Sequence, residues 1–405
     1  MNILLINHYA GSPRHGMEYR PYYLAREWVK LGHQVQIVAA TFSHVRSHQP
    51  EHAGDETIDG IAYRWIETPR YQGNGVGRVL NIWAFLKPLW RQAHHWANHF
   101  HPDLVIASST YPMDFWVARR IARLAHARLV HEIHDLWPAS PIELSGMSPR
   151  HPFALLCQKA EDDACRDADR VISMLPKVAD HLAAHGLDLH KLHIVPNGID
   201  PAEWAVPGEP LAADLAIHIA QQQRAARQLV VYAGSHGEPN ALDVLLDAAA
   251  RLRDEPFAFV LVGDGHEKLR LAGRAADEGL ENVAMFAPIA KSQIPTLLAQ
   301  ADIAYIGWKR QPLYRFGIAP NKLMDYMMAG VPVLHSVEAG NDPVAEAGCG
   351  LTVAPESPDA VVQGLRQLAA LSPGARRSMG ERGRQFVLAH HTYPVLARRF
   401  LEAVA

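Results

Sequence analysis

The chain has 405 residues, of which 48% are hydrophobic and 20% are charged, and its formal net charge is −3. This length exceeds what one ordinary hydrophobic core covers, so it predicts two domains. The small net charge gives no indication of a nucleic-acid partner. Three cysteines in no metal-ligand pattern are typical of a reducing cytoplasm. No basic segment precedes the apolar start, and no run of about 18 apolar residues occurs, so we expect a cytoplasmic protein without a signal peptide or a membrane-spanning helix.

Short apolar runs alternate with helical patterns along the first half of the chain. A helix is predicted over residues 19–31, and strands over residues 3–6, 33–39, 62–66, 104–107, 128–133, 170–174 and 192–195. The segment 196–201 contains two prolines, an asparagine and a glycine, which is the composition of a turn. We therefore place a first domain over residues 1–195.

The same alternation returns after a polar helix predicted over residues 211–227. Strands are predicted over residues 228–233, 257–262, 283–286, 303–306, 331–336 and 350–353. Strands separated by helices favour parallel sheets, whose ligands bind at the carboxyl ends of the strands. We expect two similar doubly wound α/β domains that face each other across a crevice. The second covers residues 196–385, and a last helix within 386–405 crosses back to the first.

The segment 316–332 is predicted to be a loop, a helix and then the start of a strand. Gly317 and Pro320 form the entry, and Gly330 stands where a helix ends with a left-handed residue. Backbone N–H groups at the start of this helix, together with Lys322 in its first turn, form a candidate phosphate site. An ordinary structural loop is the alternative.

Five short motifs occur in the order and spacing of a known family. They are residues 195–200, 231–235, 261–265, 300–304 and 320–332. Together they resemble the GT4 family of retaining glycosyltransferases, which have the GT-B fold. The run 131–138 resembles the branch that builds bacterial O-antigen and capsule sugars, typified by the N-acetyl-fucosaminyl transferases.

This resemblance implies two Rossmann-like domains and no obligatory metal or other cofactor. The second domain would hold a nucleotide-diphosphate sugar, with UDP favoured, and the first would hold a saccharide or lipid-linked acceptor. We therefore expect transfer of an N-acetylated hexose or deoxyhexose in surface polysaccharide synthesis, with retention of the anomeric configuration.

Several donor-binding residues follow from the resemblance and from the glycine turns at strand ends. They are Gly234, Ser235, His236, Gly263, Pro288, Ile318, Ala319, Pro320, Asn321 and Asp325. Asp325 stands where the family has a glutamate that contacts the ribose. The family's first glutamate is replaced by Gly317, and its Arg and Lys near the diphosphate are replaced by His236 and Asn240. We expect Lys322 to supply the charge, with Lys309, Arg310 and Arg315 as alternatives.

The first domain supplies the other catalytic candidate, His134, at the end of a predicted strand. A structural histidine is the alternative. Residues expected on the acceptor or phosphate side are Gly11, Gly16, Ser109, Tyr111 and Asp135.

Three further patterns need an interpretation. Residues 167–169 spell a DxD sequence, and His95 and His99 have the spacing of helical zinc ligands, but we interpret both as surface features and expect no metal site. Residues 76–96 form a Trp-rich apolar face with basic flanks, which indicates peripheral membrane contact. The alternative is a core-facing helix interrupted by Pro88.

The sequence is also compatible with two alternative functions. A sugar-nucleotide 2-epimerase of the same fold also needs two such domains. The missing charges at Gly317, His236 and Asn240 would also suit a non-catalytic partner that binds a nucleotide sugar.

Overall fold

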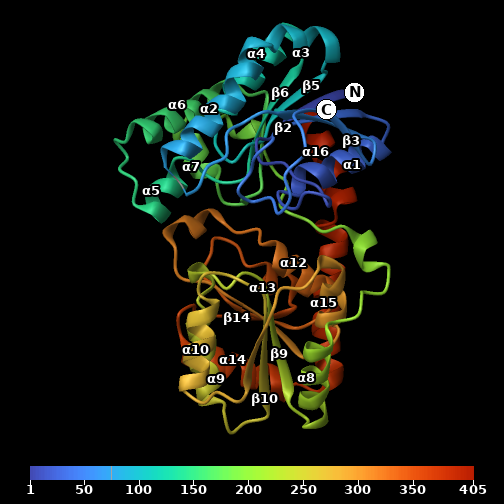
Figure 1. Ribbon diagram of the computed structural model, residues 1–405, viewed down its shortest axis with the longest axis vertical. Helices are drawn as coiled ribbons and strands as arrows, with labels where there is room; N and C mark the ends of the chain where they lie inside the picture. The colour runs from blue at the N-terminus through green and yellow to red at the C-terminus, as the bar shows by residue number, and fades with distance from the viewer. Residues whose placement is uncertain (74) are drawn as a thin grey trace. The chain divides into compact units, whose positions relative to one another are not determined.

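The computed structural model describes residues 1–73 and 75–405. Its contacts divide the chain into two compact units (Figure 1). The first consists of Met1–Asn197, Phe316–Ala319 and Tyr393–Ala405, and the second of Gly198–Arg315 and Pro320–Thr392. Each unit is a parallel sheet with helices on its faces, which confirms the predicted fold class.

Among the described residues, the sheet of the first unit has eight strands in the order β3-β4-β2-β1-β5-β6-β7-β8. The strands are β1 (Asn2–Ile6), β2 (Gln34–Ala40), β3 (Gly54–Ile58), β4 (Ile61–Ile66), β5 (Leu104–Ala107), β6 (Arg128–Ile133), β7 (Arg170–Ser173) and β8 (Leu192–Ile194). All neighbours are parallel except β3 and β4. The edge strand β3 was not predicted, because its sequence GDETI has little apolar content.

The helices of the first unit cover both faces of this sheet (Figure 1). They are α1 (Arg20–Lys30), α2 (Val76–Arg91), α3 (Ala93–Phe100), α4 (Asp114–Ala125), α5 (Ala139–Ser145), α6 (Pro152–Asp167), α7 (Ala179–Ala184) and α16 (Tyr393–Val404). The helical segment expected over residues 76–96 is two helices. They meet at Gln92, and Pro88 lies inside the first of them.

The last helix, α16, packs on α1 in the core of the first unit. The buried indole of Trp28 donates a hydrogen bond to the carbonyl oxygen of Ala397 at 3.1 Å, and its ring lies 5.1 Å from that of Phe400. The rings of Tyr23 and Tyr393 stack at 4.6 Å. The C-terminal residues therefore complete the hydrophobic core of the first unit.

The second unit has a parallel sheet in the order β11-β10-β9-β12-β13-β14. The strands are β9 (Gln228–Ala233), β10 (Phe257–Val262), β11 (Val283–Phe286), β12 (Ile303–Gly307), β13 (Val333–Ser336) and β14 (Gly350–Val353). Strand β13 begins two residues later than predicted. The amide of Val331 still bonds to the carbonyl of Tyr326 in the preceding helix, and Pro332 has no N–H for the sheet.

Helices cover both faces of this sheet as well. They are α8 (Ala213–Arg224), α9 (Leu242–Arg251), α10 (Lys268–Asp277), α11 (Ile294–Leu298), α12 (Asn321–Met328), α13 (Pro343–Ala347), α14 (Pro358–Ala370) and α15 (Pro373–His390). Successive side chains of β9 belong to two different hydrophobic cores. Val231 packs with residues of α12, whereas Val230 packs with residues of α9 and α14. The loops at the carboxyl ends of the strands carry the candidate site residues.

Candidate active-site residues

Two glycine turns at neighbouring strand ends lie against each other in the second unit. Gly234 follows β9 and Gly263 follows β10, and a Cβ atom on Gly263 would lie 1.8 Å from the carbonyl oxygen of Gly234. A Cβ atom on Gly265 would likewise lie 2.5 Å from the carbonyl oxygen of His236. The backbones approach so closely that only glycine fits at Gly263 and Gly265.

Lys322, on the first turn of α12, reaches across to the turn at Gly234. Its Nζ donates hydrogen bonds to Tyr232 Oη at 3.0 Å and to Asn240 Oδ1 at 2.7 Å. A Cβ atom on Gly234 would lie 3.1 Å from this Nζ. Burial lowers the pKa of Lys322 to about 8. The structure thus brings together two predicted residues, Lys322 and Gly234. It adds Tyr232, which was not predicted, and Asn240, which the sequence analysis named only as the replacement for the family's lysine near the diphosphate.

The three alternative cations differ from Lys322 in their partners. Lys309 pairs with Glu238 at 2.7 Å, and Arg310 pairs with Glu338 at 3.2 Å. Arg315 donates to the carbonyl oxygen of Pro312 at 2.7 Å. The two hydrogen bonds of the Lys322 ammonium end on neutral oxygens, so its charge remains available to an anion.

His236 is a buried donor beside these turns. Its side chain is fully buried, and neither ring nitrogen has a hydrogen-bond partner within the described chain. Burial lowers its pKa to about 4, so the ring is neutral at pH 7 and carries one N–H. The preceding Ser235 is exposed, and its carbonyl oxygen accepts a hydrogen bond from Tyr232 at 2.6 Å. A buried N–H without an acceptor suits a ligand oxygen.

Asp325 lies one helical turn after Lys322, on the same face of α12. Burial raises its pKa to about 7, with the charge of Lys291 opposing this and that of Glu203 adding to it. A carboxylate on this face can accept hydrogen bonds from hydroxyl groups. Asn321 is exposed at the start of α12.

Other predicted donor residues lie in loops. Pro288 is exposed in the loop after β11, and Pro320 has extended backbone angles before α12. Ala319, whose carbonyl oxygen accepts a hydrogen bond from Asn197 at 3.1 Å, belongs with Ile318 to the first unit.

In the first unit, a buried glutamate on β6 organises the end of the sheet. Glu132 accepts hydrogen bonds from Arg20 Nε at 2.9 Å and from Ser108 Oγ at 2.6 Å, and His134 Nε2 lies 3.2 Å from its carboxylate. Burial works to raise the pKa of Glu132, but Arg20 and His134 hold it well below its usual range. His134 is therefore held by an ionised, almost fully buried carboxylate. Glu132 lies within the 131–138 motif, two residues before His134, and this position was the only sequence signal for it.

Ser109 and Tyr111 follow β5 and are almost fully buried. The hydroxyl group of Tyr111 lies 2.6 Å from His8 Nδ1, and Ser109 Oγ accepts a hydrogen bond from the His8 amide at 3.0 Å. The Ser109 amide donates to Asp114 at 2.8 Å. Burial raises the pKa of Asp114 to about 7 and lowers that of His8 to about 3. Both predicted residues thus join the loops after β1 and β5.

The remaining first-unit candidates shape turns. A Cβ atom on Gly11 would lie 1.9 Å from the carbonyl oxygen of Gly16, and Gly16 has a φ of +93°. Asp135 accepts hydrogen bonds from the Leu136 amide at 2.9 Å, from the Trp137 indole at 3.1 Å, and from the hydroxyl group of Ser140. These contacts give all three residues a structural role in the loops at the sheet edge.

Two sequence patterns interpreted as surface features have simple environments. Asp167 of the DxD sequence pairs with Arg119 and with Arg166. His95 and His99 are exposed, and their rings lie 4.0 Å apart on α3.

Comparisons with known proteins agree with this arrangement. Residues 15–198 match the family model described as a glycosyl transferase 4-like domain, and residues 227–370 match that described as glycosyl transferases group 1. WcaI of Escherichia coli, a glycosyl transferase assigned to colanic acid biosynthesis, is 26% identical over 363 residues, which cover 84% of this chain and 86% of WcaI.

Solved structures share the fold along the whole chain. Sucrose-phosphate synthase from Thermosynechococcus elongatus superposes with a TM-score of 0.75 at 17% identity, covering 99% of this chain and 97% of that one. HepE from Anabaena, in complex with UDP and glucose, gives a TM-score of 0.68 at 16% identity, covering 100% and 99%. The fold and the two successive family matches define a glycosyltransferase. The chain belongs to the GT4-type glycosyltransferases of the GT-B fold.

Proposed function

We propose that the protein transfers a sugar from a UDP-sugar to a saccharide or lipid-linked acceptor in bacterial surface polysaccharide synthesis. The sugar is an N-acetylated hexose or deoxyhexose, as in the N-acetyl-fucosaminyl transferase branch. WcaI supports the polysaccharide context, and HepE, whose structure contains UDP and glucose, supports the donor. The transfer takes place in the cytoplasm, where nucleotide sugars are available.

The observation that carries this proposal is the position of Lys322. Its ammonium group lies at the glycine turn after β9, and its hydrogen-bond partners there are neutral. A diphosphate that approaches the turn would meet a buried positive charge, which is worth more there than in water. The unpartnered N–H of His236 would supply a second donor. Lys322 is thus the residue that stabilises the departing nucleoside diphosphate.

Other second-unit residues hold the rest of the donor in this proposal. Asp325 accepts hydrogen bonds from the ribose hydroxyl groups, and the loop that contains Pro288 contacts the base. Amides of the segment 318–321 hold oxygens of the sugar and the phosphate. Gly234 and Gly263 keep side chains away from the diphosphate.

The first unit binds the acceptor in this proposal, with His134 fixed by Glu132 so that its ring can position a hydroxyl group. The bond between the anomeric carbon and the phosphate oxygen breaks, and the acceptor oxygen bonds to that carbon on the same face. The acceptor proton passes to the departing phosphate oxygen, so the configuration is retained without a protein base. The residues act by positioning and by charge stabilisation, and no metal is needed for the transfer itself.

Incubation with a panel of nucleotide sugars, with and without saccharide and lipid-linked acceptors, tests the proposal. We expect release of UDP that depends on the acceptor, together with a glycosylated product whose anomeric configuration is that of the donor. An altered sugar without UDP release would instead identify a 2-epimerase. Binding of UDP without turnover of any sugar would identify a nucleotide-sugar-binding partner.

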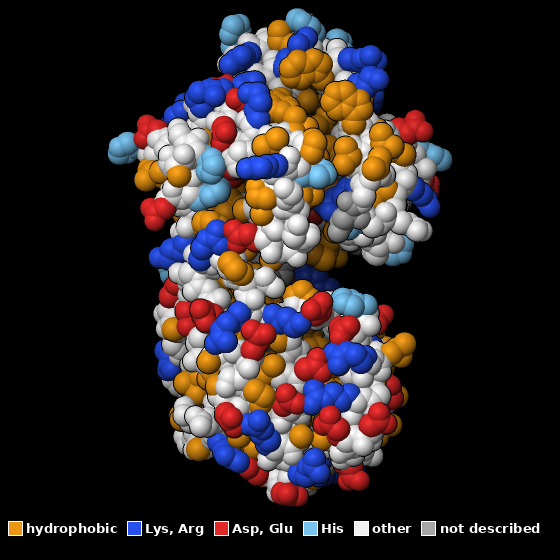
Figure 2. All heavy atoms as spheres, turned by 90° about the vertical axis from the view of Figure 1, so that its left-hand side faces the viewer, with side chains coloured by type: hydrophobic (Ala, Val, Ile, Leu, Met, Phe, Trp, Pro, Cys, Tyr) orange, Lys and Arg blue, Asp and Glu red, His pale blue; other side chains and the backbone are white. Residues whose placement is uncertain are grey.

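We also propose that α2 places the first unit on a membrane surface, where a lipid-linked acceptor would reside. In the described part of the chain, no helix is long and apolar enough to cross a bilayer. Val76, Leu80 and Trp83 of α2 are 74%, 57% and 62% exposed. Trp83 and Trp90 also line a groove of about 720 Å³. Figure 2 shows hydrophobic side chains beside lysine and arginine side chains on a face of this unit.

The charges beside this apolar surface favour an anionic bilayer. Lys87, Arg91, Arg119 and Lys159 line the same groove, with Asp163 as the acidic member. Aromatic and basic side chains together are typical of helices that lie at a membrane interface.

Vesicle co-sedimentation tests this contact. We expect the protein to bind vesicles that contain anionic lipid more strongly than neutral ones, and the double variant Trp83→Ala/Trp90→Ala to bind weakly. Leu269→Ala is the matched control, because Leu269 is 88% exposed on α10 of the second unit. Equal binding by the tryptophan variant and the wild type would contradict the proposal.

A further inference from the structure

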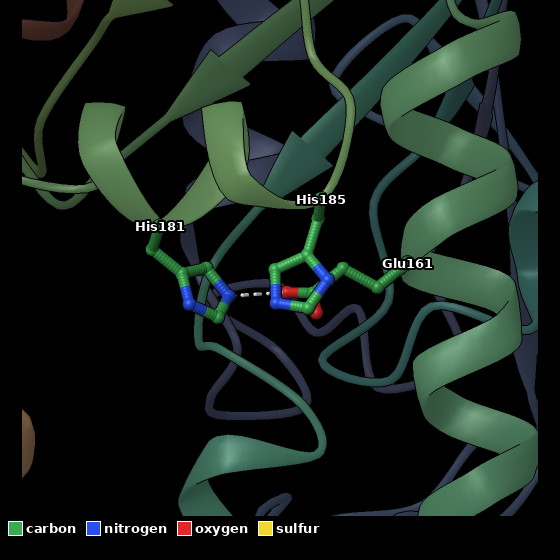
Figure 3. Close-up of side chains that lie close together, drawn as sticks. All are labelled: Glu161, His181 and His185. Atoms are coloured by element: carbon green, nitrogen blue, oxygen red, sulfur yellow. Dashed lines mark hydrogen bonds and ion pairs between the residues drawn. The ribbon is translucent and has the colours of Figure 1, made fainter.

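Two histidines and a glutamate of the first unit gather between helices α6 and α7. One ligand atom from each of Glu161, His181 and His185 lies within 4.8 Å of the others. His181 Nε2 is 2.9 Å from Glu161 Oε1. Figure 3 shows the two imidazole rings next to the Glu161 carboxylate, with His181 on α7, His185 just after the end of α7 and Glu161 on α6. Within the described residues, this is the group of three such side chains close enough to hold a metal ion.

Local structure holds the three side chains in place. His181 and His185 are four residues apart on α7 and its end, so their rings lie on one side, 4.6 Å apart. Gln158, one turn before Glu161 on α6, donates its amide to Glu161 Oε2 at 2.9 Å. The same amide nitrogen lies 2.9 Å from Asp162 Oδ1 and 2.9 Å from His185 Nδ1, so Gln158 links the members of the cluster. Local hydrogen bonds therefore hold the three side chains together.

The charge balance of the cluster favours a cation. The side chain of Glu161 is only 4% exposed, and its ion-pair partner is His181. The neighbouring Asp162 pairs with His185 at 2.9 Å. A carboxylate so deeply buried is favourable only when it is paired, hydrogen-bonded or bound to a metal ion. A divalent cation would pair with the Glu161 carboxylate and be bound by a nitrogen atom of each imidazole.

We propose that Glu161, His181 and His185 form a binding site for a divalent transition-metal ion of the zinc class. Two imidazoles and one carboxylate are a ligand set that zinc accepts, whereas calcium and magnesium prefer oxygen ligands alone. Asp162 or a water molecule would complete four-coordination. The side chains of His181 and His185 are 16% and 27% exposed, which gives the ion access from solvent.

The site also supports the loop before α12. The His181 ring lies 5.2 Å from the ring of Phe316, and the Lys177 amide donates to the carbonyl oxygen of Phe316 at 2.9 Å. Phe316 opens the segment Phe316–Ala319, which belongs to the first unit. An ion on His181 would fix the surface against which Phe316 packs. His181 is thus a positioning residue for the segment Phe316–Ala319. This positioning role rests on the proposed function of the loop in donor binding.

Metal titration of the full chain, purified without a histidine tag and stripped with a chelator, tests the site. We expect one equivalent of Zn²⁺ to bind in competition with a chromophoric chelator, and Co²⁺ to give the intense visible absorption of a four-coordinate site. We expect a loss of Zn²⁺ affinity of at least about tenfold in each of three variants, His181→Ala, His185→Ala and Glu161→Gln. Even the loss of a residue that hydrogen-bonds to a metal ligand costs that much affinity. No bound ion in the wild type, or unchanged affinity in all three variants, would overturn the proposal.

A second histidine pair provides the matched control, because the chain has 24 histidines that could bind zinc weakly. His95 and His99 have the same spacing and lie 4.0 Å apart, but they are exposed on α3. The double variant His95→Ala/His99→Ala should bind one equivalent like the wild type, and loss of binding in it would refute the assignment. Circular dichroism without metal shows whether each variant folds. If the α7 variants do not fold, the Co²⁺ spectrum of the wild type decides, and a six-coordinate spectrum counts against the site.

Thermal shifts with UDP separate the site from its effect on the loop. We expect the UDP-dependent rise in Tm to be larger with one equivalent of Zn²⁺ than after chelation. Zinc binding with an unchanged UDP shift would overturn the positioning role and leave the metal site. Zinc binding without any UDP shift would count against the donor proposal instead.

Discussion

The ammonium group of Lys322 lies 2.7 Å from the side-chain oxygen of Asn240, a residue 82 positions earlier in the chain. In the resembling family a lysine near this position helps to neutralise the diphosphate. A second ammonium group here would lie beside Lys322 and repel it, whereas an asparagine oxygen holds it. The departure at Asn240 and the charge at Lys322 are therefore two parts of one arrangement.

Lys322→Ala should lower kcat/KM for the sugar donor by about 100- to 1000-fold, the loss typical when a buried group that stabilises developing charge is removed. Steady-state UDP release measures this effect. Lys309→Ala is the control, because Lys309 is an exposed residue paired with Glu238 and should change kcat/KM by less than about twofold. Wild-type kinetics in Lys322→Ala would refute the assignment.

Asn240→Asp tests whether the charge of Lys322 must remain uncompensated. The substitution keeps the shape of the side chain but places a carboxylate 2.7 Å from the ammonium group. We expect the pKa of Lys322 to rise and UDP affinity to fall, because the new ion pair competes with the diphosphate. Asn240→Ala should lower the affinity for UDP less than Asn240→Asp does, because it adds no negative charge. Calorimetric titration with UDP measures both, and tighter binding by Asn240→Asp would contradict the prediction.

Asp325→Asn should stabilise the protein at pH 8 while weakening its donor affinity. Burial raises the pKa of Asp325 from 3.8 to about 7, so the folded state binds this proton more tightly than the unfolded state. The stability contribution of Asp325 is therefore lost as pH rises from about 4 to 7. Asparagine has no such dependence, so the variant should have a higher Tm than the wild type at pH 8, and the difference should shrink at pH 5. A constant difference across this range would exclude the ionisation as its cause.

Much of the fold could be predicted from the sequence because most strands are short, continuous apolar runs between helices. The strand β3 could not, since its residues are polar and it pairs at a sheet edge. The break at Gln92 was also missed, because the helical pattern continues through it while the backbone does not.

The candidate site was predicted only where it depends on local sequence. Glycines that follow buried strands mark the turns at Gly234 and Gly263. The partners of Lys322 lie 90 and 82 residues away, and Arg20 lies 112 residues from Glu132. Such contacts depend on which strands become neighbours in the sheet, and local sequence patterns do not reveal the strand order.

Glu132→Gln should destabilise the first unit by about 3–5 kcal/mol, because it leaves the buried guanidinium group of Arg20 without its counter-charge. Denaturant unfolding followed by far-UV circular dichroism measures the loss. Asp359→Asn is the control, since the pair of Asp359 with Arg251 is exposed and its loss should be barely detectable. Equal stability of Glu132→Gln and the wild type would show that Arg20 finds another partner.

Gly317→Glu, which restores the family's first acid, should lower stability without raising turnover. Gly317 has a φ of +97°, a backbone conformation that residues with a Cβ atom adopt only with strain of roughly 1–2 kcal/mol. Gly317→Ala should lose the same stability, because the strain comes from the Cβ atom and not from the carboxylate. Gly273→Ala is the control, since Gly273 lies in α10 with open space around it, and alanine there should stabilise the helix. Thermal unfolding and UDP release measure the two effects, and a faster Gly317→Glu enzyme would show that the loop can adopt the family's conformation.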